Sequence, residues 1–172
     1  MHREQRQRDN DAGRVIGWCY TPGVSELRMF SWTTQDGLVS VGTLGGTRSY
    51  PGTGLPLVTA AGETVGASFV SGDSFFHAFA WTPHSGLTDL GTLGGPLSEA
   101  SAVNNRGLVV GESSTAAGKF DAFAWTPGTG MVDLGSLGAS SYARSVSNSG
   151  LIVGTSYLTP TGSEAHAVLW TW

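Results

Sequence analysis

Charge is scarce in this sequence of 172 residues. Lys, Arg, Asp and Glu together make up 13% of the chain, which is about half the usual share. The nine Lys and Arg residues are spread thinly and the net charge is -4, so no basic stripe is available to neutralise a phosphate backbone. We therefore expect no nucleic-acid partner.

The sequence is also poor in cysteine and lacks long apolar runs. Its single cysteine, Cys19, cannot form an internal disulfide. No run of about 18 apolar residues is present, so we expect no membrane insertion. The first ten residues are dominated by polar and charged side chains and no apolar segment follows them, so the sequence predicts no signal peptide in this chain.

Glycine, by contrast, is abundant. It accounts for 26 of the 172 residues, about twice its average frequency. Because glycine weakens helix interiors by about 1 kcal/mol, this content favours strands joined by tight turns, and we expect few or no helices. Hydrophobic residues make up 40% of the chain, which is enough for a single domain of this length to bury a core.

Tryptophan marks an internal repeat. Four tryptophans recur about 45 residues apart, each followed by Thr: Trp32, Trp81, Trp125 and Trp170. The surrounding text reads Phe-Phe-His-Ala-Phe-Ala-Trp-Thr-Pro at 75–83 and Phe-Asp-Ala-Phe-Ala-Trp-Thr-Pro at 120–127. We expect these tryptophans to fill the space between sheets.

Three further blocks keep the same register. A short β-branched strand bracketed by glycines occupies 13–17, 62–66, 107–111 and 150–154, and in three copies it follows a turn that contains Asn. A Leu-Gly strand at 87–95 and 131–138, and a strand of small residues at 98–103 and 141–146, complete the unit. Each full unit is therefore predicted to contain about four short strands.

These features predict an all-β fold of tandem repeats, with a β-propeller-like ring as the first choice. A β-solenoid or other stacked β-array is the alternative, because periodicity proves repetition and not closure. The predicted organisation is a charged tail at 1–9 and one β-repeat domain at 10–172, with units at 10–58, 59–103, 104–146 and an incomplete one at 147–172. Since an incomplete unit exposes strand edges, we expect a homo-oligomer formed through it.

Several of the recurring blocks resemble those of a known family. His-Ala-Phe-Ala-Trp-Thr-Pro at 77–83, Leu-Thr-Asp-Leu-Gly-Thr-Leu-Gly-Gly at 87–95 and Asn-Asn-Arg-Gly-Leu-Val-Val-Gly at 104–111 are similar to the HAF repeat family of extracellular bacterial repeat proteins. The resemblance covers nearly everything from Asn10 to Trp172, and it implies an exported or cell-surface protein with no activity assigned to the repeat itself. The first copy departs from it, with Arg28-Met-Phe in place of His-Ala-Phe, as does an insertion within 47–57.

Three glutamates are the candidate catalytic residues. Glu63, Glu99 and Glu112 each occur in one copy of the repeat, and residues that break a repeated frame are places where function can be added. Two carboxylates held about 5 to 10 Å apart in a cleft suffice for glycoside hydrolysis. The alternative is that these are solvent-facing positions that have drifted.

Aromatic and arginine side chains are the candidate ligand-binding residues. Planar rings stack on the apolar faces of sugars, and arginines supply hydrogen bonds. The candidates are Trp18, Arg48, Tyr50, Tyr142 and Arg144. Scattered surface aromatics are the competing interpretation for Trp18.

No metal site or cofactor is expected. His77 and His166 share one repeat position, where the other copies have Arg28 and Asp121, so we expect an edge residue that hydrogen-bonds a neighbouring unit. Cys19 occupies the position of Ser68, Ser113 and Ser156, which favours a small strand residue over a thiol nucleophile.

The leading functional hypothesis is a non-catalytic, extracellular repeat scaffold that binds a carbohydrate or a protein. The alternative is a small β-propeller-like hydrolase that acts on glycosides through its glutamates. A third hypothesis is a fragment of a longer repeat protein without a task of its own.

Overall fold

A computed structural model shows that the chain is built from strands. The structure describes residues 5–20, 26–161 and 164–172, and this part of the chain forms 15 strands and no helix. Accordingly, none of these residues belongs to a helix long and apolar enough to cross a membrane. The prediction of an all-β protein without helices is confirmed.

The strands form four small antiparallel sheets. In each sheet, strands that follow one another in the chain lie side by side. The first sheet contains β1 (Gln5–Asp9), β2 (Val15–Tyr20), β3 (Leu27–Thr33) and β4 (Gly37–Ser40). The second contains β5 (Gly45–Pro51), β6 (Thr64–Val70), β7 (Phe76–Thr82) and β8 (Gly86–Asp89).

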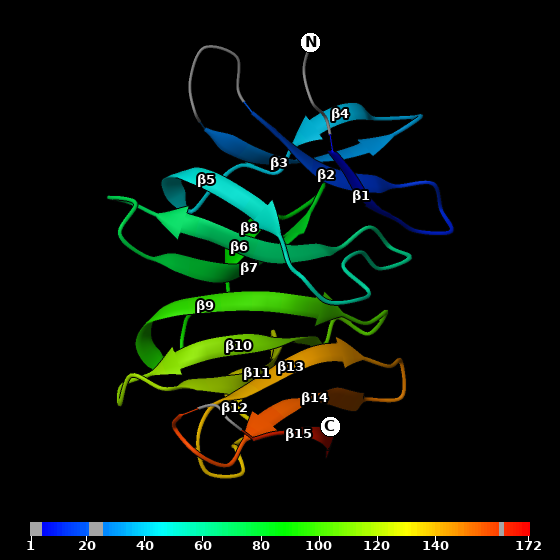
Figure 1. Cartoon of the computed structure of the whole chain (residues 1–172). Helices are drawn as coiled ribbons and strands as arrows, with labels where there is room; N and C mark the ends of the chain where they lie inside the picture. Colours follow the sequence, from blue (N-terminus) through cyan, green and yellow to red (C-terminus); the bar gives the residue numbers. More distant parts are fainter. Residues whose placement is uncertain (1–4, 21–25, 162–163) are drawn as a thin grey trace.

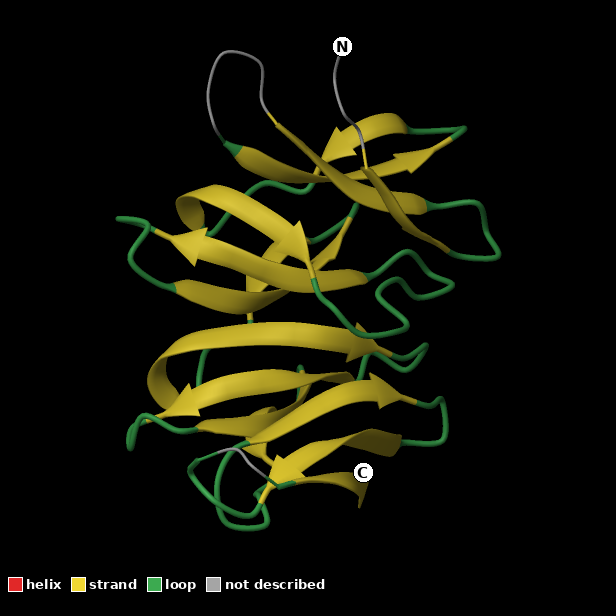
Figure 2. Ribbon diagram, viewed as in Figure 1, coloured by secondary structure: helices red, strands yellow, loops and turns green. Residues whose placement is uncertain are grey.

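The third and fourth sheets repeat this order. The third contains β9 (Gly94–Val103), β10 (Val109–Thr115), β11 (Phe120–Thr126) and β12 (Gly130–Asp133). The fourth contains β13 (Ser141–Val146), β14 (Leu151–Tyr157) and β15 (Ala165–Thr171). The sheets follow one another along the molecule from the N-terminal end to the C-terminal end (Figures 1 and 2).

The boundaries of the sheets differ from those of the predicted units. Residues 5–9, expected to belong to a charged tail, form β1 and pair with β2. The strands of small residues, expected to close a unit, instead open a sheet: β9 pairs with β10 and β13 with β14. The reason is local, because the turn at 104–107 joins β9 and β10 into a hairpin, and hairpin strands pair with each other.

Phenylalanine rather than tryptophan forms the centre of the packing. Phe79 and Phe123, each two residues before a repeated tryptophan, are completely buried. Trp81 is buried as expected, whereas the other three tryptophans of the repeat are only half-buried. Strand β10 is buried on both faces, because Val109 belongs to the core that joins the first three sheets and Val110 to the core that joins the third and fourth.

Buried serines connect neighbouring sheets. The hydroxyl of Ser98 on β9 accepts a hydrogen bond from the backbone N–H of Ala78 on β7 at 2.8 Å. Ser49 and Ser141 make the same connection, accepting from the N–H groups of Met29 and Ala122. Each serine is fully buried, so each bond satisfies a strand N–H that has no access to water.

The inner strands, which are the first strands of each sheet, contain a bulge. Ser101 and Arg144 are the extra residues where the β9–β10 and β13–β14 registers shift. In the second sheet the chain loops out more widely at this place, because Pro51 pairs with Gly66 and Val58 with Thr64, leaving residues 52–57 between the two pairs.

This loop of residues 52–57 crosses the inner strands of the next two sheets. The N–H of Gly54 donates to the carbonyl of Ser101 at 3.1 Å, and the N–H of Leu55 donates to the carbonyl of Arg144 at 3.4 Å. The hydroxyl of Ser145 donates to the carbonyl of Leu55 at 2.6 Å. The insertion noticed in the sequence therefore binds the second, third and fourth sheets together.

Gly54 allows the loop to approach this closely. A Cβ on Gly54 would overlap the carbonyl oxygens of Arg144 and Ser101, which are backbone atoms and cannot rotate away. We expect Gly54→Ala to lower the free energy of unfolding by about 1–3 kcal/mol. A matched control is Gly128→Ala, because the nearest atom to its added Cβ would be 4.0 Å away. Urea denaturation of both variants tests this, and equal stabilities would show that the loop is not closely packed.

Candidate functional site

Two of the three candidate glutamates lie side by side. Glu99 on β9 and Glu112 on β10 are cross-strand partners. Side chains opposite each other in an antiparallel pair lie on the same face, with Cβ atoms about 4.5–5.5 Å apart. The two carboxylates therefore form a close pair between the third and fourth sheets.

Arg144 completes this pair from the fourth sheet. Its Nη1 lies 2.9 Å from Oε2 of Glu112 in an ion pair, and the Arg144 side chain is 44% exposed against 19% for Glu112. Arg144 occupies the bulge of β13, and a bulge can redirect a side chain relative to its strand. The ion pair is thus reachable from solvent through the arginine.

The surroundings shift the pKa values of the Glu99 and Glu112 carboxyl groups differently. Burial and, to a smaller extent, the charge of Glu112 raise the pKa of Glu99 to about 7, although Arg144 opposes the shift. Burial raises the pKa of Glu112 as well, but its ion pair with Arg144 counteracts that effect. Glu99 therefore titrates near neutral pH, while Arg144 favours the ionised form of Glu112.

Tyr50 on β5 of the second sheet interacts electrostatically with Glu99. Burial raises the pKa of the Tyr50 hydroxyl, the charge of Glu99 adds to the shift, and Arg48 opposes it. The guanidinium of Arg48 itself lies 4.2 Å from the ring centre of Phe69. Tyr50, Glu99, Glu112 and Arg144 are called the carboxylate cluster below.

A tyrosine-lined cavity lies next to the carboxylate cluster. Arg144 connects the two, because its guanidinium carbon is 5.1 Å from the ring centre of Tyr142. Tyr142 stacks against Phe120 at 6.5 Å and meets Tyr157 edge-on at 6.0 Å. The cavity has a volume of about 190 Å³ and is called the tyrosine cavity; its lining residues are Ala139, Ser140, Tyr142, Tyr157, Thr159 and Pro160.

Two of the candidate residues lie elsewhere. Glu63 is in the turn before β6, where its backbone N–H donates to the hydroxyl of Thr59 at 3.0 Å, and burial raises the pKa of its carboxyl group. Trp18 is half-buried on β2 of the first sheet, which contributes no residue to the carboxylate cluster. Glu63 and Trp18 became candidates because they differ from the repeated pattern, and that difference does not indicate where they lie in the fold.

His77 contacts a residue of its own sheet. Nδ1 of His77 lies 2.9 Å from a carboxylate oxygen of Asp89 on β8, the adjacent strand of the same sheet. The expectation of a bond to a neighbouring unit is therefore wrong for His77, because the partner strand within its own sheet is nearer. Within the described ranges, no three His, Cys, Asp or Glu side chains come together as metal ligands would.

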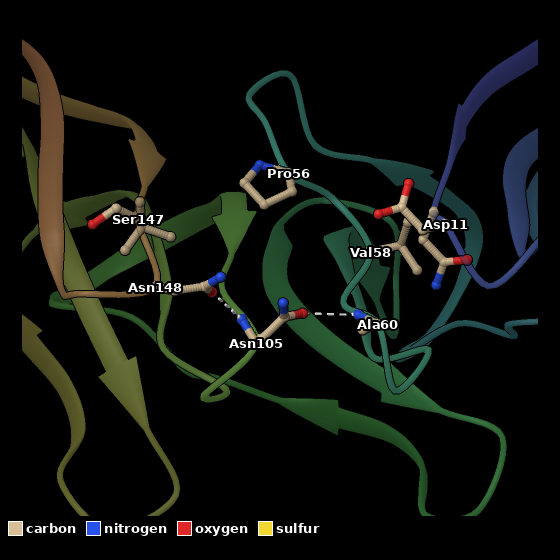
Figure 3. Close-up of a pocket in the computed structure, with 9 residues that line it drawn as sticks. Asp11, Pro56, Val58, Ala60, Asn105, Ser147 and Asn148 are labelled. Atoms are coloured by element: carbon tan, nitrogen blue, oxygen red, sulfur yellow. Dashed lines mark hydrogen bonds between the residues drawn. The ribbon is translucent and has the colours of Figure 1, made fainter.

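A second cavity, called the turn pocket below, was not predicted from the sequence. It has a volume of about 370 Å³ and is lined by Asn10, Asp11, Pro56, Val58, Ala60, Asn105, Val146, Ser147 and Asn148. These residues come from turns and inner strands of all four sheets (Figure 3). The recurring Asn was visible in the sequence, but its role in forming turns gave no indication that the turns surround a common space.

Comparisons with known proteins add no relative from which a role could be transferred. Searches against protein-family models, curated proteins and solved structures found no match to this chain. The function therefore has to be argued from the geometry of these sites.

The raised pKa of Glu99 makes stability depend on pH. Its folded-state pKa of about 7 lies above the ordinary 4.5, so the folded state holds a proton that the unfolded state releases between these values. The stability that Glu99 contributes is fully present below pH 4.5 and is lost as pH rises through 7. We expect Glu99→Gln to be more stable than the parent protein by about 1–3 kcal/mol at pH 8 and similar to it at pH 4.

Urea denaturation at pH 4, 6 and 8 measures this difference. Glu164→Gln, which changes an exposed carboxylate, is the matched control and should follow the parent protein at every pH. If the free energies of unfolding of Glu99→Gln and the parent protein changed in parallel with pH, the raised pKa of Glu99 would be contradicted.

Proposed function

We propose that this protein is a non-catalytic binding module that recognises carbohydrate through the carboxylate cluster and the tyrosine cavity. The observation that carries the proposal is the position of Arg144, which pairs with Glu112 on one side and lies over the ring of Tyr142 on the other. Charged hydrogen-bonding groups and aromatic rings thus lie within one small region.

This combination suits a sugar. The apolar face of a sugar ring packs on aromatic side chains, while its hydroxyl groups bond to carboxylates and to the guanidinium. A protein ligand is the other partner class, but specific protein interfaces bury about 800 Å² on each partner. A cavity of about 190 Å³ holds only a small group, which favours a single sugar unit over a protein surface.

The scaffold that we propose is propeller-like. Each sheet is a consecutive antiparallel meander, and each inner strand packs on the preceding sheet, as β9 does on β7 through Ser98. A stacked β-array remains the alternative arrangement. Membership of the HAF repeat family and an extracellular or cell-surface location are proposals that rest on the recurring sequence blocks.

Self-association through the fourth sheet also stays a prediction. Its support is the set of exposed apolar side chains there, which are Leu151, Val153, Leu169 and Trp172. Exposed apolar groups beside an open strand edge favour pairing with another chain.

Arg144 provides the direct test of sugar binding. We expect Arg144→Gln to weaken binding of the best ligand from a soluble glycan panel by about tenfold or more, because charge-assisted hydrogen bonds to the sugar are lost. Isothermal titration calorimetry measures the affinity. Arg106→Gln removes the same charge from an exposed turn and should bind like the parent protein. Equal losses in both variants, or no binding to any glycan, would reject the proposal.

Glycoside hydrolysis is the second candidate function. It is favoured by one observation, that Glu99, with a pKa raised to about 7, lies opposite Glu112, whose ionised form is favoured by the ion pair with Arg144. A retaining glycosidase uses such a pair, with one carboxyl group as the acid and the other as the nucleophile. Neither the tyrosine cavity nor the turn pocket is lined by these two glutamates, and this favours sugar binding over hydrolysis.

A panel of chromogenic glycosides distinguishes the two functions. If the protein is a hydrolase, activity should fall as pH rises above about 7, where Glu99 loses its proton. Glu99→Gln and Glu112→Gln should each abolish that activity, and Glu63→Gln should retain it, because Glu63 lies in a different part of the fold. Sugar binding without turnover on any substrate would leave the non-catalytic function.

A further inference from the structure

The turn pocket is built by a row of hydrogen bonds between successive turns. The Asn10 amide nitrogen donates to the carbonyl of Thr59 at 2.7 Å, joining the first turn to the second. The Ala60 N–H donates to Oδ1 of Asn105 at 2.8 Å, and the Asn105 N–H donates to Oδ1 of Asn148 at 2.9 Å. The turns of all four sheets are thereby fixed relative to one another.

These bonds determine the orientation of two side-chain amides. Oδ1 of Asn105 and Oδ1 of Asn148 are both occupied by backbone N–H groups, so the two NH₂ groups must face the other way. Figure 3 shows their nitrogens on the side of the pocket toward Pro56. Neither NH₂ group has a hydrogen-bond partner among the residues that the structure describes. The pocket therefore presents N–H donors held in a fixed direction.

The opposite end of the pocket carries a carboxylate. Asp11 lies there, exposed and across the pocket from Asn148 (Figure 3). The ring of Pro56 and the side chains of Val58 and Val146 give the pocket an apolar part of its lining. Pro56 belongs to the loop of residues 52–57, whose Leu55 bonds to the backbone of Arg144, so the loop lies between the turn pocket and the carboxylate cluster.

The arrangement selects one class of small molecule. An anion would accept from the amides but would be repelled by Asp11, and a simple cation would pair with Asp11 but leave the amide donors without an acceptor. A hydroxyl group both donates and accepts, so a compound with several hydroxyl groups satisfies both ends at once. Its C–H face can pack on Pro56 and Val146, and the volume of about 370 Å³ lies in the range of small-molecule sites.

We infer that the turn pocket is a second binding site, specific for one unit of a neutral sugar and separate from the tyrosine cavity. It shares its ligand class with the proposed function and in that respect rests on it, although it uses none of the same side chains. A glycan longer than one unit could be held at two places by a protein with both sites, which would raise its overall affinity.

Asn148→Asp is the discriminating substitution. It keeps an oxygen in the place of Oδ1 to accept from the Asn105 N–H, and it replaces only the NH₂ group that faces the pocket. Asp11→Asn removes the charge at the other end. Asp133→Asn is the matched control, because Asp133 lies outside the pocket and its Oδ1 accepts from the Gly135 N–H, which an asparagine can also do.

The measurement is an NMR titration of the full chain with a panel of free neutral hexoses. The side-chain NH₂ signals of Asn105 and Asn148 report the pocket, and the ring signals of Tyr142 report the tyrosine cavity. We expect at least one hexose to shift the pocket signals in the parent protein, in Asp133→Asn and in Arg144→Gln. Asn148→Asp and Asp11→Asn should each weaken that response about tenfold or more.

The outcomes separate the two sites. Hexose shifts confined to Tyr142 would overturn the inference and leave the proposed function standing. Shifts confined to the pocket would support the inference and count against the tyrosine cavity as the sugar site. A pocket response that survives both Asn148→Asp and Asp11→Asn would overturn the inference, as would stronger binding of an amine such as glucosamine to Asn148→Asp with no response to neutral hexoses in the parent protein.

Discussion

The structure depends on satisfying the backbone N–H groups of β3, β7 and β11, the third strands of their sheets, where one small sheet packs on the next. The apolar side chains on both faces of the third sheet are covered by its neighbours, as Val109 and Val110 show. Covering them removes water from strand N–H groups, and an unpaired buried N–H costs about 1–3 kcal/mol. The serines at 49, 98 and 141 accept from those groups, which makes close stacking of the sheets compatible with hydrogen bonding.

The same constraint positions the sites. A bulge leaves one inner-strand residue outside the ladder, and in the fourth sheet that residue is Arg144, which can then reach Glu112 on the third sheet. The loop of residues 52–57 uses the carbonyls of the bulge residues Ser101 and Arg144 as acceptors and places Pro56 in the wall of the turn pocket. The features that hold the sheets together therefore also create the places where a ligand can bind.

The carboxylate pair works against stability. Burying two like charges is costly, and the raised pKa of Glu99 is the visible sign of that cost. Arg144 lowers the cost for both carboxyl groups, and it also forms an ion pair with Glu112. A pair of residues such as Tyr50 and Ala67, which occupy the equivalent cross-strand positions in the second sheet, would avoid the problem. That a less stable pair occupies the third sheet is consistent with a role in binding.

Much of the fold could be predicted because its signals are local. The repeated glycines required at turns and the alternation of small residues on strands depend on the backbone conformation of a few neighbouring residues, and they led to an all-β repeat protein. The prediction of the sheet boundaries failed because strand partnership depends on which hairpin forms, and the short turn at 104–107 decided that. Phe79 and Phe123, and not the repeated tryptophans, form the centre of the packing, because the register of each strand determines which residue faces inward.

For the sites, the sequence by itself identified Glu99 and Glu112 as residues that break the repeat, and Tyr50 and Arg144 as aromatic and hydrogen-bonding candidates. It did so because the copies can be compared with one another. It could not separate these residues from Glu63 and Trp18, and it gave no sign that Asn105 and Asn148 face one pocket. Only the tertiary structure decided those questions, because residues more than 40 positions apart come together through the stacking of whole sheets, and no local pattern encodes which faces will meet.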